Sequence, residues 1–325
     1  MNLKSRVLIK SSFWGFLLTP VLLFFCSSSL MASDYRILAL GPENNFFTDV
    51  LARLEKEFVV YYTIADAGSP YESFEADIER FRPHVVVLLD NVILNHYREY
   101  QRRHPDRVPF PPIIAMMGVH IDASIKNLNI MGINYQVPAV ASLVKLRDMI
   151  GIPLEKVGVL YPASLETSFR QQEAWCAREK IELKGYPLSE KSKSSIRKGL
   201  KRLIKKDDVD ALWIFNDHIM LSPDMIAFWK GRLKRFNKPI VVGLENLARH
   251  GVGNYAVVPD SQELSVQLEE IIYELEENGW RAEPGKAYDP ISHLTILNVA
   301  VARKHWKLNE EKLQEVDIRL QDNRK

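Results

Sequence analysis

Short apolar runs alternate with amphipathic segments along most of this chain. At residues 129–168, a predicted strand (131–135) leads into a predicted helix (138–150), a Gly-Ile-Pro turn and a second predicted strand (157–161). Several strands, such as YRILAL at 35–40, are almost entirely apolar, which is typical of parallel strands covered on both faces. The same alternation continues on both sides of this stretch. The pattern therefore predicts an α/β protein with doubly wound parallel sheets, in which residues 129–168 join two lobes.

The chain has 325 residues, more than one hydrophobic core usually serves, so we expect two domains. We predict an N-terminal α/β lobe at 34–136, completed by about 281–308, and a C-terminal α/β lobe at 137–280. A charged C-terminal tail is predicted at 309–325. Ligands of open parallel sheets bind beyond the carboxyl ends of the strands, so we expect a ligand cleft between the two lobes.

The N-terminal segment 1–33 has the pattern of a signal peptide. A positively charged beginning precedes an apolar run at 13–25, and the small-residue stretch CSSSLMAS follows. The run has the length of a signal-peptide core and is short for a membrane span. The pattern predicts export to the periplasm, with cleavage near Ala32 or Ser33. The alternative is a segment that is retained as an anchor helix.

The two cysteines are Cys26 and Cys176, so the exported chain has no cysteine pair for an internal disulfide. Cys26 is a candidate for lipid attachment, but Phe25 stands immediately before it, where a small residue is expected. We interpret Cys176 as a small apolar residue buried in a helix.

The charge of the chain argues against a nucleic-acid partner. The net charge is +2, and loss of the signal removes three of 43 positive and none of 41 negative charges, which leaves −1. The basic run KSKSSIRKGLKRLIKK at 191–206 is compatible with nucleic acid or an acidic membrane. We interpret it instead as an amphipathic helix with an apolar buried stripe and a solvated face of lysines.

Polar residues follow almost every predicted strand, where the ligand of such a fold is held. Asn, Asp, Glu, Ser and Tyr suit hydrogen bonding to a small polar molecule, and the acidic side chains suit an ammonium group. Each of them can instead cap a helix or form a turn. The candidate ligand-binding residues are Asn44, Asp90, Tyr135, Tyr161, Ser168, Asn216, Asp217 and Glu245.

The sequence lacks the common signatures of catalysis and of cofactor binding. It contains no GxxxxGK[ST] phosphate loop, no GxGxxG after the first strand, no GxSxG and no HExxH. The eight histidines are scattered without metal-ligand spacing. We therefore expect a protein that is not an enzyme and that uses no metal or cofactor.

Several stretches of the sequence resemble the bacterial ABC-transporter substrate-binding proteins of the type I periplasmic-binding fold, in the tryptophan/tyrosine-type group. The resemblance is carried by strand-loop segments that recur in that family. They are GINYQVP, VGVLYPASLETS, WIFNDHIMLSP, VVGLENLARHGVG, AVVPDSQELS and LTILNVAVARKHWKL.

The resemblance implies a monomer that closes like a hinge around a small ligand and delivers it to an inner-membrane permease. It also implies that backbone amides and Ser168 hold a carboxylate, that Asp217 or Glu245 holds an amine, and that Tyr135 or Tyr161 stacks on the ligand. The alternatives are a periplasmic sensing module that signals to a membrane kinase and an enzyme that uses the same cleft. A repressor of this fold would need a DNA-binding segment where the signal lies.

Overall fold

The computed structural model describes residues 34–43, 45–66, 68–106, 110–118, 130–189, 192–217 and 220–321. The predicted signal segment with Cys26, and the candidate residue Asn44, lie outside the described residues. The chain from Asp34 onward forms one compact unit. Among the described residues, no helix combines the length and the hydropathy that a membrane crossing requires.

The first lobe is built on a parallel sheet with the strand order β11-β5-β4-β3-β1-β2. Its strands are β1 (Arg36–Gly41), β2 (Val59–Ile64), β3 (Val85–Leu89), β4 (Ile113–Gly118), β5 (Ile130–Asn134) and β11 (Ala287–Tyr288). Its helices are α1 (Asn45–Leu54), α2 (Tyr71–Phe81), α3 (Asn91–Arg103) and α10 (Ser261–Glu277).

The second lobe is built on a sheet with the order β13-β12-β10-β9-β8-β6-β7, in which only the β10–β12 pair is antiparallel. Its strands are β6 (Lys156–Pro162), β7 (Glu182–Leu188), β8 (Ala211–Ile214), β9 (Ile240–Val242), β10 (Tyr255–Pro259), β12 (His293–Asn298) and β13 (Ile318–Leu320). Its helices are α5 (Ala139–Met149), α6 (Glu166–Arg178), α7 (Lys193–Lys205), α8 (Pro223–Leu233), α9 (Glu245–Arg249) and α11 (Val299–His305), with 3-10 turns η1 (Ala163–Leu165) and η2 (Lys312–Glu315).

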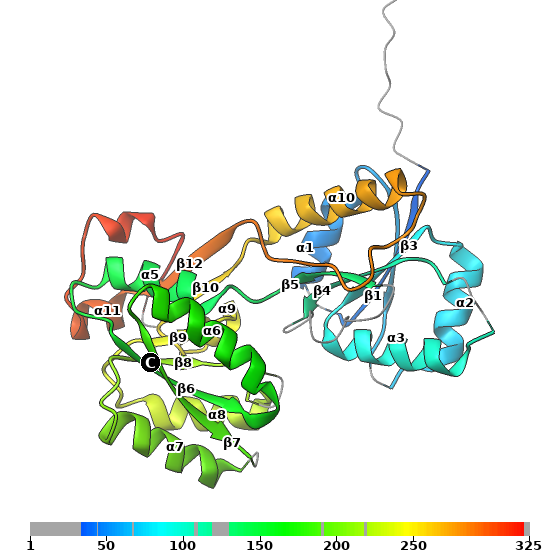
Figure 1. The fold of residues 1–325 in the computed structure, drawn as a ribbon. Helices are drawn as coiled ribbons and strands as arrows, with labels where there is room; N and C mark the ends of the chain where they lie inside the picture. The colour runs from blue at the N-terminus through cyan, green and yellow to red at the C-terminus, as the bar shows by residue number, and fades with distance from the viewer. Residues whose placement is uncertain are drawn as a thin grey trace, which may run out of the picture. The chain divides into compact units, whose positions relative to one another are not determined.

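The central strands are apolar throughout because helices cover both faces of each sheet. In the first lobe, Ile37 and Val85 pack on the side of α1 and α10, whereas their neighbours Leu38 and Val86 pack on the side of α3. Successive side chains of a strand point to opposite faces, so a strand covered on both faces must be apolar at every position. Figure 1 shows α10 beside α1 in this lobe. The predicted doubly wound fold is confirmed.

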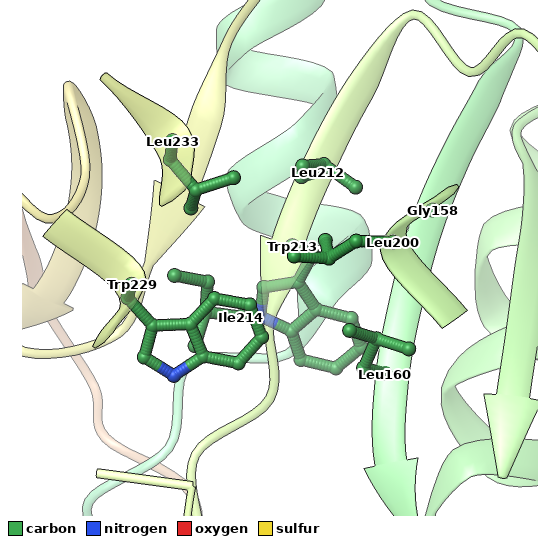
Figure 2. Close-up of a pocket in the computed structure, with 8 residues that line it drawn as sticks. All are labelled: Gly158, Leu160, Leu200, Leu212, Trp213, Ile214, Trp229 and Leu233. Carbon is green, nitrogen blue, oxygen red and sulfur yellow. The ribbon is translucent and has the colours of Figure 1, made fainter. Parts of the chain in front are cut away.

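The core of the second lobe is closely packed beneath α7 and α8. Figure 2 shows Trp229 of α8 and Leu200 of α7 around a small apolar cavity that Leu160 and Leu212 of the sheet also line. The cavity measures about 10 Å³, which is at the lower limit for one water molecule, and its walls are apolar. It is therefore a packing defect of the core and not a ligand site.

Cys176 lies fully buried in α6, where burial raises the pKa of its thiol to about 12. The interpretation of this residue as a small apolar side chain is confirmed. A thiol with such a pKa stays protonated and unreactive at neutral pH.

The ends of the chain pair differently from the predicted lobe boundaries. Residues 281–308 were expected to complete the first lobe, but only β11 joins that sheet, whereas β12 pairs with β10 in the second. Helix α10 was expected in the second lobe, but its apolar face packs into the first-lobe core. The predicted charged tail contains β13 and the buried residues Leu313 and Val316. The apolar residues of this segment are buried although charged residues surround them. A strand such as β13 needs an apolar side chain on only one of its faces to pack on the protein.

The described chain passes from one sheet to the other three times, after β5, after β10 and after β11. Hydrogen bonds tie these connections to one another. Asn134 Nδ2 donates to Asp289 Oδ1 at 3.3 Å, and Gln267 Nε2 donates to the Asp289 carbonyl at 2.9 Å. The Asp260 amide donates to the Ser292 carbonyl at 3.1 Å.

Candidate functional site

Asp90 follows β3 in the first lobe and caps the next helix. Its Oδ1 accepts hydrogen bonds from the amides of Val92 and Ile93, at 2.8 and 2.9 Å, at the start of α3. The residue has a φ of 110°, a conformation that L-residues rarely adopt. Burial raises the pKa of its carboxyl, although the two amide hydrogen bonds lower it. Asp90 therefore caps α3, which was the alternative to its predicted role as a ligand contact.

A second polar group, the hydroxyl of Tyr62, lies within electrostatic reach of Asp90 and was not among the predicted site residues. Tyr62 of β2 donates a hydrogen bond of 2.5 Å to the Pro42 carbonyl. Burial raises the pKa of its hydroxyl, and the nearby carboxylates of Glu43 and Asp90 raise it further. The carboxyl edge of the first sheet is therefore acidic, which suits a positively charged group. Because β2 and β3 both pair with β1, the residues at their carboxyl ends come close together. This proximity of Tyr62 to Asp90 can be predicted only when the strand order is known.

Replacement of Asp90 separates its capping role from its charge. Asp90→Asn keeps an oxygen that accepts the two amide bonds, so its unfolding free energy at pH 7 should equal or exceed that of the unmodified protein. Asp90→Ala should lose about 1 kcal/mol because the cap is lost. Denaturant titrations measure the unfolding free energies of both variants, and titrations at several pH values measure how these free energies depend on pH.

The pH dependence has a defined sign. Because the pKa of Asp90 is higher in the folded state than its ordinary value of 3.8, the folded state binds the proton more tightly. The contribution of this carboxyl to stability should therefore rise as the pH falls towards 3.8, and Asp90→Asn should remove that rise. An equal loss of stability in the asparagine and alanine variants would contradict this account of the cap.

Asn216 and Asp217 follow β8 and are both buried in the second lobe. The Asp217 carbonyl accepts a hydrogen bond from the Leu221 amide at 3.0 Å, and its Oδ1 accepts one from the Met220 amide at 3.2 Å. Asn216 lies directly against Gly243, which follows the neighbouring strand β9. A Cβ atom at Gly243 would overlap the Asn216 side-chain amide. The missing side chain at 243 therefore makes room for the Asn216 amide at the carboxyl edge of the sheet.

Glu245 is the first residue of α9, just after β9, and its side chain is 30% exposed. Its Oε1 forms an ion pair of 2.5 Å with Arg249, one helical turn later. Tyr135, which follows β5 of the first lobe, is affected by the same carboxylate. Burial raises the pKa of the Tyr135 hydroxyl, and the charge of Glu245 raises it further. These two predicted site residues, which lie 110 positions apart in the sequence, therefore interact electrostatically.

Tyr161 is the last residue but one of β6, and its ring lies in the core. The ring stacks on Phe169 at a centroid distance of 4.2 Å and an angle of 5°, and the residue is 2% exposed. Its hydroxyl donates a hydrogen bond of 2.5 Å to Glu166 Oε2. A stacking role towards a ligand would require one of the two ring faces, and Phe169 already covers one. Phe169 therefore leaves at most one face of the Tyr161 ring for stacking on a ligand.

Ser168 is the third residue of α6 and is partly exposed. The residue before this helix, Leu165, forms no side-chain cap. In contrast, Asp90 caps α3, and Asp260 caps α10 through a 2.9 Å bond to the Gln262 amide. The 3-10 turn η1 runs directly into α6, and its Ala163 carbonyl accepts a hydrogen bond from the Glu166 amide. No capping side chain occupies the first turn of α6, which suits a carboxylate.

Two polar surface cavities lie elsewhere in the second lobe. One, of about 440 Å³, is lined by Arg147, Lys156 and Glu179, and the other, of about 230 Å³, by Lys145, His293 and Asp317. Neither contains a predicted site residue. In the part of the chain that the structure describes, no three His, Cys, Asp or Glu side chains come together to hold a metal ion.

Comparison with known proteins places this chain by its fold. No protein-family model matches the sequence, and the search of curated proteins finds no match. An ABC domain from Streptococcus pneumonia in complex with L-Trp has a TM-score of 0.60 at 14% sequence identity, over 89% of this chain and 100% of that chain. A ligand-free, open substrate-binding protein with adhesive properties from Clostridium difficile has a TM-score of 0.61 at 12% identity, over 88% and 99%.

The same fold also occurs in a protein of another class. A transcriptional activator of the comK gene from Bacillus halodurans has a TM-score of 0.50 at 12% identity, over 79% of this chain and 89% of that chain. This chain therefore has the type I periplasmic-binding fold, as the sequence segments predicted. At such low identities, the likeness establishes the fold alone.

Proposed function

We propose that this protein is an extracytoplasmic solute-binding protein of an ABC-type importer that binds an amino acid or a related compound by closing two lobes around it. The observation that carries the proposal is the set of polar residues at the carboxyl edges of two sheets that have the same core strand order. That order is β2-β1-β3-β4-β5 in the first lobe and β7-β6-β8-β9-β10 in the second. The reported complex of a structural neighbour with L-Trp supports a ligand of this kind.

The proposed contacts divide the ligand into three parts. The uncapped first turn of α6, with Ser168, suits the carboxylate of an amino acid. Glu245 suits its ammonium group, because the carboxylate is partly exposed and lies near the strand ends. Asp217 is the second candidate for the ammonium, but one of its oxygens already accepts the Met220 amide. Tyr135 offers its ring to an apolar side chain, and Asn44, Asp90, Tyr161 and Asn216 complete the proposed set.

Hinge closure is supported by the connections between the two sheets. Closure changes the backbone angles of a few connecting residues, while each lobe moves as a unit. The hydrogen bonds of Asp289 to Asn134 and Gln267 tie the connecting segments to the first lobe. The residues around 135–138, 259–261 and 289–292 are therefore the proposed hinge. An inner-membrane ABC permease is the proposed partner, and the protein is proposed to act in the periplasm as a monomer after export by its N-terminal signal.

The experiment that tests this function is calorimetry on the chain from Asp34 onward, refolded so that no ligand is carried through purification. The titrants are L-tryptophan, L-tyrosine, the other amino acids and simple sugars. We expect saturable one-to-one binding of at least one amino acid. Binding of sugars alone would contradict the proposed ligand class and leave the solute-binding function in place.

A further inference from the structure

The outer surfaces of α7 and α8 carry an unusual density of positive charge. We call this surface the basic face. Its members are all exposed lysines and arginines on the two helices and the residues directly after them. They are Lys193, Arg197, Lys198, Lys201, Arg202, Lys205, Lys206, Lys230, Arg232, Lys234 and Arg235.

The packing of the two helices fixes which way these charges point. Ile196 and Leu203 of α7, and Met225 and Trp229 of α8, are buried in the same core cluster beneath the helices. The opposite sides of both helices therefore face the solvent. The Arg197 guanidinium lies 5.6 Å from the centre of the Phe228 ring of α8, so the two helices are in contact at this point. Figure 1 shows α7 and α8 next to each other in the second lobe, and the lysines and arginines of both helices are exposed.

The charge of this surface is only weakly neutralised. Residues 193–238 contain twelve lysines and arginines against five aspartates, a net charge of +7, whereas the whole chain carries +2. Arg202 lies 3.7 Å from Asp207, and Lys238, beside the face, pairs with Asp208 at 2.9 Å. Among the described residues, no carboxylate pairs with the other cations of the basic face. Favourable contact with the helix dipole explains basic residues only in a last turn, whereas Lys193, Arg197 and Lys198 stand in the first half of α7.

We propose that the basic face docks the protein onto an anionic phospholipid bilayer. A cluster of four to eight lysines and arginines on an amphipathic helix is typical of binding to anionic lipid, and α7 with the residue after it carries seven. The net charge of +2 and the pI of about 8.3 are lower than those of nucleic-acid-binding domains. The preference for a membrane over a nucleic acid rests also on the proposed function, since a protein that serves a permease works at a bilayer surface.

Docking through this face leaves the proposed ligand contacts free, because none of them belongs to it. The two functions can therefore be measured separately. Membrane docking should be purely electrostatic and should weaken as salt is added, because salt screens the attraction between exposed charges.

The test is co-sedimentation of the chain from Asp34 onward with phosphatidylcholine vesicles that contain or lack phosphatidylglycerol. We expect binding to the anionic vesicles only. Replacement of Lys198, Lys201 and Lys205 by glutamine should weaken it at least about tenfold. The matched control replaces the exposed residues Lys56, Lys304 and Lys307 by glutamine, which changes the net charge equally and should alter binding less than about twofold. Circular dichroism checks that every variant is folded.

Arginine at the three positions 198, 201 and 205 should restore vesicle binding, because the attraction depends on charge and not on the lysine side chain. Equal losses in the glutamine variant and its control would overturn the proposal, since net charge alone would then set the affinity. Tighter binding to a DNA duplex than to anionic vesicles would also overturn it. Calorimetry with L-tryptophan on the same samples reports the ligand function independently, so failure of one proposal is distinguishable from failure of the other.

Discussion

Replacement of Glu245 by glutamine is expected to weaken binding of an amino acid about tenfold to a hundredfold. The variant keeps the shape of the side chain but removes its charge. Loss of a hydrogen bond to a charged group costs about 1.5–3 kcal/mol, which corresponds to that range of affinity. Calorimetry with the amino acid that binds the unmodified protein measures the change, beginning with L-tryptophan.

Arg249→Gln provides the matched control for this prediction. Arg249 forms the 2.5 Å ion pair with Glu245 and therefore competes with any ammonium group for its carboxylate. Its removal should leave the affinity unchanged or increase it, although both variants lose the same ion pair. If both variants weakened binding equally, the ion pair and not the carboxylate would be the element required. An affinity of Glu245→Gln within about twofold of the unmodified protein would remove Glu245 from the site.

Replacement of Gly243 by alanine is expected to be strongly destabilising, by about 1–3 kcal/mol, because the new Cβ atom would overlap the side-chain amide of Asn216. Asn216 is 2% exposed and follows β8, the strand that pairs with β9 just before Gly243, so the amide has little free space into which to move. Thermal and denaturant unfolding measure the loss. Binding of the amino acid should weaken as well, because Asn216 is displaced from the edge of the sheet.

The double variant Asn216→Ala/Gly243→Ala tests the cause of this loss. If the overlap is responsible, the double variant should be more stable than the sum of the two single losses predicts, because the small alanine at 216 makes room. Gly231→Ala in α8 is the control for the substitution itself. No atom lies within 4 Å of a Cβ added there, so that alanine should stabilise the helix by about 0.5–1 kcal/mol. Simple additivity at positions 216 and 243 would show that the contact does not limit stability.

The local elements of this fold can be predicted from the sequence, but the pairing of its last strands cannot. The strands β3 and β10, and β1 after Arg36, are apolar at every position because both sheet faces are covered, and that pattern is visible in the sequence. The strand β13 is short, lies among charged residues and gains its stability from a parallel partner, β12. Pairing between distant segments leaves no local pattern, and neither does the return of α10 to the first lobe.

The candidate site could be predicted at the level of strand ends, but not at the level of individual side chains. Parallel pairing brings the ends of neighbouring strands to one edge, which explains the proximity of Asn216 to Gly243. Sequence alone does not distinguish an aspartate that caps a helix, such as Asp90, from one that faces a ligand. It also does not show that Phe169 covers a face of the Tyr161 ring. Both facts depend on side-chain contacts that form only in the folded chain.

Titration calorimetry of the ligand-free protein is the decisive test of whether this chain binds a small solute between its two lobes. The chain from Asp34 onward is unfolded, freed of bound solutes, refolded and titrated with amino acids one at a time. We expect one-to-one, saturable binding of at least one of them, with an affinity that Glu245→Gln weakens and Arg249→Gln does not. The absence of saturable binding by every amino acid and sugar, in a protein whose circular dichroism shows it to be folded, would contradict the account.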